Sequence, residues 1–172
     1  MHGADWQGQD CAGWIATEKL DGVRALWDGQ ALFTRGGHRI HAPAWFTKGL
    51  PAFPLDGELW GGYRALSVAN ALWQASPNHA AWPLARFLAF DVPDAPGGYV
   101  ERMASLPERI APHCWPVPLH HAPSNAAMFA LLDSILARGG EGLVMRPAGL
   151  PYRRGERDER ILKVKHHWRE RA

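Results

Sequence analysis

The most reactive side chain that the sequence offers is Lys19. A protonated lysine is a poor nucleophile, and it becomes a good one where neighbouring cations or desolvation favour the neutral amine. Residues 18–24 read Glu-Lys-Leu-Asp-Gly-Val-Arg, so a tight Asp-Gly turn and then an arginine follow the lysine. This order suits an amine directed at a phosphate, with Arg24 in reach of the same ligand. A solvated surface lysine is the simpler reading of this string alone.

A second pair of cations lies near the C-terminus. In residues 161–165, period-2 alternation places Leu162 and Val164 on one face of a strand and Lys163 and Lys165 on the other. Two neighbouring ammonium groups repel each other, and a bound anion would convert that cost into binding energy. The alternative is a solvated edge strand, in which lysine guards against aggregation.

Three carboxylates and one aromatic ring are further candidates. Asp56 and Glu58 share one face of a strand over residues 55–60, and Glu141 follows two glycines. Carboxylates near lysines can hold a divalent cation or a ribose hydroxyl, although each alone could be an ordinary surface acid. Phe90 could belong to the core, or it could stack on a nucleobase beside a phosphate site.

These residues must be positioned by a mixture of strands and helices. Residues 14–35 read as strands with a hairpin turn at Asp28-Gly29, and Ser124 reads as the N-cap of a helix that ends at Gly139-Gly140. Further strands are predicted over 55–60, 86–92, 112–118, 141–146 and 160–166, and further helices over 64–75 and 99–110. Residues 41–54 look irregular. Strands in hairpin order mixed with helices predict a mainly antiparallel α+β fold.

Length, composition and charge limit the number of domains and the classes of partner that the chain can have. The 172 residues predict one domain, and 47% hydrophobic residues predict a folded core. The net charge is only +2, but residues 153–172 hold eight Lys/Arg against four Asp/Glu, so this end suits an anionic partner. Cys11 and Cys114 show no metal-binding spacing. No run reaches the ~18 apolar residues of a membrane span and no leader is evident, so we expect no membrane association; the compartment stays open between cytoplasm and periplasm.

Taken together, these segments resemble the catalytic core of the covalent nucleotidyltransferases, which comprise DNA ligases, RNA ligases and mRNA capping enzymes. The Lys-x-Asp-Gly-x-Arg motif of that family is met by residues 19–24. The motifs that follow it are met, in the family's order, by residues 34–37, 56–58, 90–91, 141–146 and 162–165. The sequence looks most similar to the minimal, often exported, bacterial ATP-dependent DNA ligases.

The resemblance implies a role for each motif residue. Lys19 would attack the α-phosphate of ATP to form a lysyl-AMP phosphoramidate, and Glu141 and Glu58 would help to hold Mg²⁺ or Mn²⁺. The nucleotide would be bound by Glu18, Arg24, Arg35, Glu58, Phe90, Lys163 and Lys165. Among these, Phe90 would stack on adenine and the two lysines would contact the α-phosphate. Lys163, Lys165, Arg24 and the metal would favour a neutral Lys19.

The resemblance also implies a substrate and a domain organisation. AMP would pass to the 5′-phosphate of a nick in double-stranded DNA, and the 3′-hydroxyl would then seal the strand. An OB-fold domain normally follows the last motif, and residues 166–172 are too few to form one. We therefore expect residues 1–172 to be an adenylation domain without its OB-fold, and we expect a monomer with no obligate protein partner. Only 18 residues precede Lys19, which favours ATP over NAD as the AMP donor.

Two other functions fit the same residues. An RNA ligase or a capping-type guanylyltransferase would use the same lysine chemistry on another substrate. A non-catalytic nucleotide-binding or nucleic-acid-binding module would bind DNA with a steep salt dependence but would form no covalent AMP.

Overall fold

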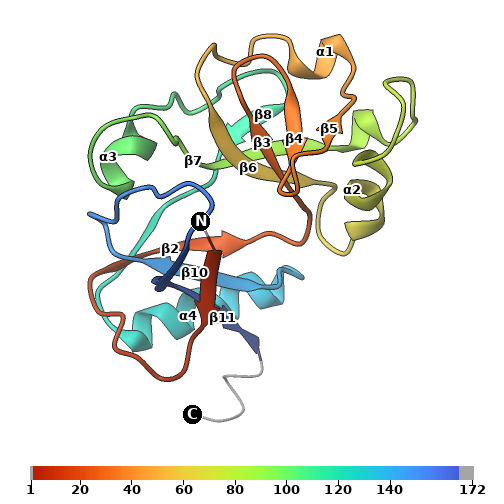
Figure 1. The fold of residues 1–172 in the computed structure, drawn as a ribbon. Coiled ribbons are helices and arrows are strands. Elements are labelled where there is room, and N and C mark those ends of the chain that lie inside the picture. Colours follow the sequence, from red (N-terminus) through yellow and green to blue (C-terminus); the bar gives the residue numbers. More distant parts are fainter. Residues whose placement is uncertain (1, 167–172) are drawn as a thin grey trace. The chain divides into compact units, whose positions relative to one another are not determined.

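The computed structural model describes residues 2–166 and divides into two compact units (Figure 1). The first, called unit 1, comprises residues 1–20, 97–100 and 118–172, and the second, called unit 2, comprises residues 21–96 and 101–117. Each unit contains its own sheet and its own hydrophobic cluster.

Unit 1 is built on a five-stranded sheet in the order β1-β11-β10-β2-β9. Its strands are β1 (His2–Asp5), β2 (Trp14–Lys19), β9 (His120–Ala122), β10 (Gly142–Arg146) and β11 (Arg157–Lys165). One face of this sheet carries buried apolar residues, including Leu143 and Val164, and clusters with Met128 and Leu132 of helix α4 (Asn125–Ala137). The opposite face carries Lys19 together with the buried Ile15 and Thr17 of the same strand.

Helix α4 begins and ends where its sequence signals predict. Ser124 is the N-cap in an extended conformation, and its hydroxyl accepts a hydrogen bond from the amide of Ala127 at 3.2 Å. Gly139 follows the helix with a φ of 89°, which a glycine adopts at little cost.

Unit 2 is built on a six-stranded sheet in the order β5-β4-β3-β6-β7-β8. Its strands are β3 (Val23–Trp27), β4 (Leu32–Thr34), β5 (Arg39–Ile40), β6 (Leu55–Trp60), β7 (Arg86–Asp91) and β8 (Cys114–Pro116). Its helical segments are α1 (Ala44–Thr47), α2 (Leu66–Leu72) and the 3₁₀ turn Trp82–Leu84, and α3 (Tyr99–Ala104) has residues in both units.

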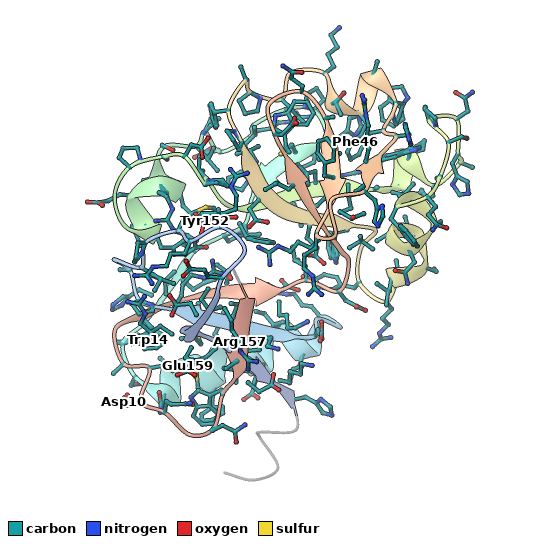
Figure 2. The ribbon with its side chains drawn as sticks, viewed as in Figure 1. Asp10, Trp14, Phe46, Tyr152, Arg157 and Glu159 are labelled. Carbon is teal, nitrogen blue, oxygen red and sulfur yellow. The ribbon has the colours of Figure 1, made fainter. Side chains whose placement is uncertain are left out.

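The two faces of the unit 2 sheet differ in character. The core face presents Ala25, Leu59, Phe87 and Ala89, which cluster with Phe46 of α1 (Figure 2). Because neighbouring residues on a strand alternate between faces, the other face is formed by Arg24, Leu26, Asp56, Glu58, Leu88 and Trp115. We call this second set the non-core face.

The predicted α+β class is confirmed, and so is the mainly antiparallel pairing, with two parallel pairs at β1–β11 and β7–β8. The strand over residues 55–60 and the hairpin at Asp28-Gly29 occur as predicted. The helix predicted over 64–75 is shorter, Leu66–Leu72, and the one predicted over 99–110 ends at Ala104, before Pro107. Pro107 lacks an amide hydrogen and disfavours helix in the residue before it, so a helix stops there.

Several elements have no signal in the sequence. Strands β1, β5 and β9 are two to four residues long, too short to show a period, and they form because a neighbouring strand offers backbone partners. A short helix, α1, lies within residues 41–54, which were predicted to be irregular. Cys11 and Cys114 are both free and buried. Among residues 2–166, no helix is long and apolar enough to cross a membrane.

Candidate active site

In unit 1, adjacent strands bring Lys19 and Lys165 onto one face of the sheet. Lys19, the last residue of β2, is aligned with Gly142 of β10, and Gly142 is aligned with Lys165 of β11. Laterally aligned residues of a sheet point to the same side. Because the residue between the two lysines is a glycine, no side chain separates them.

A carboxylate bridges these two ammonium groups. Glu141 immediately precedes β10, and its Oε2 accepts a hydrogen bond from Lys19 Nζ. Its Oε1 lies 3.7 Å from Lys165 Nζ. Side chains of the three residues are 22–36% exposed, so the cluster is partly desolvated but open to a ligand. The sequence predicted Glu141 as a metal ligand and did not predict it as a partner of either lysine.

Gly142 is required by close packing at this point. A Cβ on Gly142 would collide with the carbonyl oxygen of Val164 on β11. The approach of β10 to β11 therefore depends on a glycine directly after Glu141, which explains the Glu-Gly order in the sequence.

Lys163 lies on the same face, one row further along β11. It is aligned with Val144 of β10 and with Asp5 of β1. Its Nζ lies 3.3 Å from Asp5 Oδ1, and Asp5 is 53% exposed. Sequence reasoning missed Asp5, because β1 has no detectable pattern of its own.

Glu18 occupies the opposite face of β2. Its carboxylate lies 3.9 Å from an amino group of Arg138, which caps the C-terminus of α4, and its Oε1 lies beside Gly140. The predicted nucleotide-binding role of Glu18 thus involves a side chain on the other side of the strand from Lys19.

In unit 2, Arg24 is held in a fixed position on the non-core face. Its Nε and one amino group donate to the two carboxylate oxygens of Asp56 at 3.0 and 2.6 Å. The guanidinium carbon also lies 5.4 Å from the centre of the Phe90 ring. Asp56 is 2% exposed, so this bidentate pair has little competition from water. The sequence placed Asp56 beside Glu58 but did not identify it as the partner of Arg24.

Glu58 and Gly22 lie beside this pair. Glu58 of β6 is aligned with Arg24 of β3. A Cβ on Gly22 would collide with the carbonyl oxygen of Leu59 and would lie 2.8 Å from Cγ of Glu58. The Asp-Gly turn after Lys19 therefore packs tightly against the strand that carries Glu58.

A buried ion pair fixes the strand that presents Phe90. Asp91 accepts hydrogen bonds from Nε of Arg102 at 2.7 Å and from an amino group of the same arginine at 3.1 Å. Both side chains are almost fully buried. The pairing of β6 with β7 shifts register between Asp56 and Gly57, next to Phe90, which is half-buried on the side away from Ala89. The alternative core assignment for Phe90 is thus not supported by its burial.

Arg35, the last of the predicted site residues, lies on the surface. It lies in the turn that follows β4 and is exposed. The Thr34 amide donates to the His38 carbonyl oxygen at 2.8 Å and closes this turn. The side chain is therefore available to a ligand of unit 2.

The carboxylates near Lys19 bear on whether the chain could hold a metal ion. Within residues 2–166, no group of three or more His, Cys, Asp or Glu side chains could hold a metal ion. Mg²⁺ in nucleotide sites is commonly bound by one or two carboxylates together with substrate phosphates and water. A single carboxylate such as Glu141 fits a metal that arrives with a nucleotide and does not fit a resident metal centre.

Comparison with known proteins decides the family. No protein-family model matches the chain. The DNA ligase of Haemophilus influenzae (strain ATCC 51907 / DSM 11121 / KW20 / Rd) is 34% identical over 164 residues, which cover 93% of this chain and 60% of that ligase. A solved structure from a structure-function study of Lig E DNA ligases, on DNA binding with a minimal scaffold, is 31% identical with a TM-score of 0.84. That alignment covers 95% of this chain and 67% of the solved one. The chain belongs to the DNA ligases.

More distant ligases share the fold. The Chlorella virus DNA ligase-adenylate is 19% identical with a TM-score of 0.73 over 95% of this chain and 65% of its own. The ATP-dependent DNA ligase of bacteriophage T7, solved in complex with ATP, is 16% identical with a TM-score of 0.62. That alignment covers 95% of this chain and 67% of the T7 enzyme. The resemblance to DNA ligases predicted from six motifs in order is therefore confirmed by the two nearer matches, and the more distant ligases show the same fold. The chain spans about 60% of the length of the curated relative.

Proposed function

We propose that this chain carries out the adenylation chemistry of an ATP-dependent DNA ligase, with Lys19 as the nucleophile. The observation that carries the proposal is the contact of Lys19 with Glu141, whose carboxylate also approaches Lys165. One amine, one proton acceptor and one further cation then lie on a single face of the unit 1 sheet. These are the groups that transfer of a nucleotidyl group to an amine requires.

The step can be written from the residues in contact. Lys19 must first lose a proton from Nζ, and the Glu141 carboxylate is the acceptor that already receives its hydrogen bond. The nitrogen lone pair then forms the bond to the α-phosphorus of ATP, and the nitrogen loses its second proton to solvent to give the neutral phosphoramidate. The bond from that phosphorus to the bridging oxygen breaks, and pyrophosphate leaves with the electron pair. Lys165 would stabilise negative charge on the α-phosphate as it develops.

Unit 2 would supply much of the nucleotide binding. Phe90 would stack on adenine, Glu58 would contact the ribose, and Arg24 and Arg35 would contact ribose or phosphate. The bidentate contact with Asp56 fixes the guanidinium of Arg24 before any ligand arrives, which reduces the entropy lost on binding.

The remaining predicted residues belong to unit 1. Lys163 would contact the α-phosphate after exchanging its partner Asp5. Glu18, the other predicted nucleotide-binding residue, would contact the ligand from the side of β2 that faces Arg138. The resemblance implies Glu141 and Glu58 as carboxylates for a divalent cation, and such a cation, when bound with the nucleotide, would neutralise phosphate charge and assist the leaving pyrophosphate.

Substrate and later steps follow from the family. The T7 enzyme was solved with ATP and the Chlorella virus enzyme as an adenylate, which supports ATP as the AMP donor here. The Lig E study concerns DNA binding, which supports DNA as the acceptor. We propose that AMP passes to the 5′-phosphate of a nicked duplex and that the 3′-hydroxyl then seals the nick. Residues 1–172 would act together as the adenylation domain.

The proposal is tested by covalent labelling. The purified chain is incubated with MgCl₂ and with ATP or GTP labelled at the α-phosphate, and then separated under denaturing conditions. We expect label from ATP on the unchanged chain and on Lys48→Ala, which alters an exposed lysine after α1, and no label on Lys19→Ala. Label from GTP alone would contradict the ATP assignment and would favour a capping-type enzyme.

A further inference from the structure

Two arginines of unit 2 lie over one tryptophan at the edge of the six-stranded sheet. The guanidinium carbon of Arg86 lies 5.7 Å from the centre of the Trp115 ring, and that of Arg109 lies 5.2 Å from it. Arg86 begins β7 and Trp115 lies in the edge strand β8, whereas Arg109 belongs to the loop before β8. Two like charges are thus held against the same ring.

Backbone carbonyl groups hold both guanidinium groups in place. One amino group of Arg86 donates to the carbonyl oxygens of Ala85 at 2.9 Å and Pro83 at 3.4 Å. Arg109 donates from Nε to Ala111 at 3.4 Å and from an amino group to Pro112 at 2.9 Å. Each arginine keeps further N–H groups that these bonds do not use.

Neither arginine has an acidic partner in the part of the chain that the structure describes. The ion pairs found among residues 2–166 involve other arginines and lysines, and none joins a carboxylate to Arg86 or Arg109. The same two charges act on His113, whose pKa is lowered by burial first and then by repulsion from Arg86 and Arg109. This edge of unit 2 therefore carries two positive charges that no ion pair among residues 2–166 neutralises, which suits an anion.

The pair continues the face that carries the proposed nucleotide residues. Trp115 is aligned with Leu88, Leu88 with Glu58, and Glu58 with Arg24. All four residues therefore belong to one row across strands β8, β7, β6 and β3 on the non-core face. Arg86 is aligned with Trp60 in the neighbouring row, so Arg86 and Trp115 share this face with Arg24.

We propose that Arg86 and Arg109, supported by Trp115, bind the phosphodiester backbone of DNA. A guanidinium on an aromatic ring stays planar and presents its remaining N–H groups sideways, which is the arrangement that phosphate oxygens accept. This inference rests on the proposed DNA substrate and adds a contact surface outside the motifs that bind the nucleotide.

A duplex backbone fits this surface better than an acidic polypeptide does. Glutamate and aspartate side chains space their charges irregularly, whereas a DNA strand offers a phosphate at every nucleotide. The tryptophan ring is already covered by two guanidinium groups, so phosphate contact, and not stacking of a base, is the role that it supports. Such contacts position a nucleic acid without reading its sequence.

The test measures binding of a nicked DNA duplex by fluorescence anisotropy over a series of salt concentrations. The variant Arg86→Gln/Arg109→Gln is compared with the control Arg39→Gln/Arg157→Gln, which removes two exposed positive charges from β5 and β11. We expect the first variant to bind several-fold more weakly and to lower the slope of log K against log salt by about 2. We expect a smaller change in affinity and in salt slope for the control variant. The effect of both variants should not depend on the DNA sequence.

Equal losses in the two variants would show a net-charge effect and would overturn the proposal. A polyglutamate peptide serves as the competing probe, and a loss of peptide binding with unchanged DNA binding would also overturn it. Trp115→Leu keeps both charges and removes the ring beneath them, so we expect weaker DNA binding with a salt slope closer to that of the unchanged chain, and a melting curve checks that this variant is folded. Labelling of Lys19 by ATP, measured on the same samples, tests the proposed function separately, because neither arginine belongs to the nucleotide site.

Discussion

The proposed-site lysines of unit 1 and two arginines of unit 2, Arg24 and Arg102, are paired with carboxylates in different ways. In unit 1 the pairs of Lys19 and Lys165 with Glu141, and of Lys163 with Asp5, involve side chains that are 22–53% exposed. In unit 2 the carboxylates of Asp56 and Asp91 are each 2% exposed and accept bidentate bonds from arginines.

This difference indicates different roles for the two sets of pairs. An exposed ion pair contributes little to stability, so a phosphate can replace one partner at low cost. A buried bidentate pair is costly to break because the remaining charge is left without compensation. The unit 1 pairs are therefore suited to exchange with substrate, and the unit 2 pairs to fixing the shape of the non-core face.

The largest expected effect comes from the exchangeable pairs. Glu141→Gln removes the proton acceptor of Lys19 and preserves the size of the side chain. We expect the rate of covalent AMP formation to fall about 10²- to 10⁴-fold, the usual contribution of a general base, with little change in melting temperature. The rate is measured by labelling under single-turnover conditions. Glu156→Gln, at an exposed glutamate paired with Arg153, is the matched control, and an equal loss there would refute the role of Glu141.

For the buried arginine pairs of unit 2 we expect a large loss of stability, in contrast to the loss of activity expected for the exposed pairs. Asp91→Asn removes the charge of the carboxylate that accepts two bonds from the buried Arg102 guanidinium, and we expect unfolding free energy to fall by about 3–5 kcal/mol. Urea denaturation measures this loss. Asp158→Asn, at the pair with the half-exposed Arg160, should lose much less. Similar losses in both variants would mean that burial does not distinguish the two kinds of pair.

The tight turn after Lys19 gives an intermediate effect. Gly22→Ala would force a Cβ against the carbonyl oxygen of Leu59 and should destabilise the chain by about 1–3 kcal/mol. Gly149→Ala has open space around the new Cβ and serves as the control. Thermal melting of both variants checks this, and equal melting temperatures would show that β6 moves to accommodate the methyl group.

The smallest effect concerns a buried thiol. Burial raises the pKa of Cys114 from 9.0 to about 12. The thiol ionises at a lower pH in the unfolded chain than in the folded one. Its contribution to the unfolding free energy is therefore complete below pH 9 and is lost as the pH rises towards 12. At pH 10 the loss is about 1 kcal/mol. The fall in unfolding free energy from pH 8 to pH 10 should therefore be smaller by this amount in Cys114→Ala, and equal falls would contradict the burial argument.

The sequence predicted the residue types of the site better than their partners. Lys19, Glu141 and Lys165 were predicted from local order and lie in contact in the structure, and alternation correctly placed Lys163 and Lys165 on one face. The partners Asp5 and Arg138 could not be found, because β1 has no period of its own and the end of α4 reaches Glu18 only in the folded chain. Asp56 was noticed beside Glu58, but its pairing with Arg24 depends on the register between β3 and β6, which no local pattern encodes.

Mapping of the adenylated residue tests the central claim most directly. The chain is incubated with ATP and MgCl₂, digested, and analysed by tandem mass spectrometry to locate AMP among the lysine-containing peptides. The account predicts AMP on Lys19 and no modification of Lys163 or Lys165. AMP on either of those lysines, with Lys19 unmodified, would contradict it.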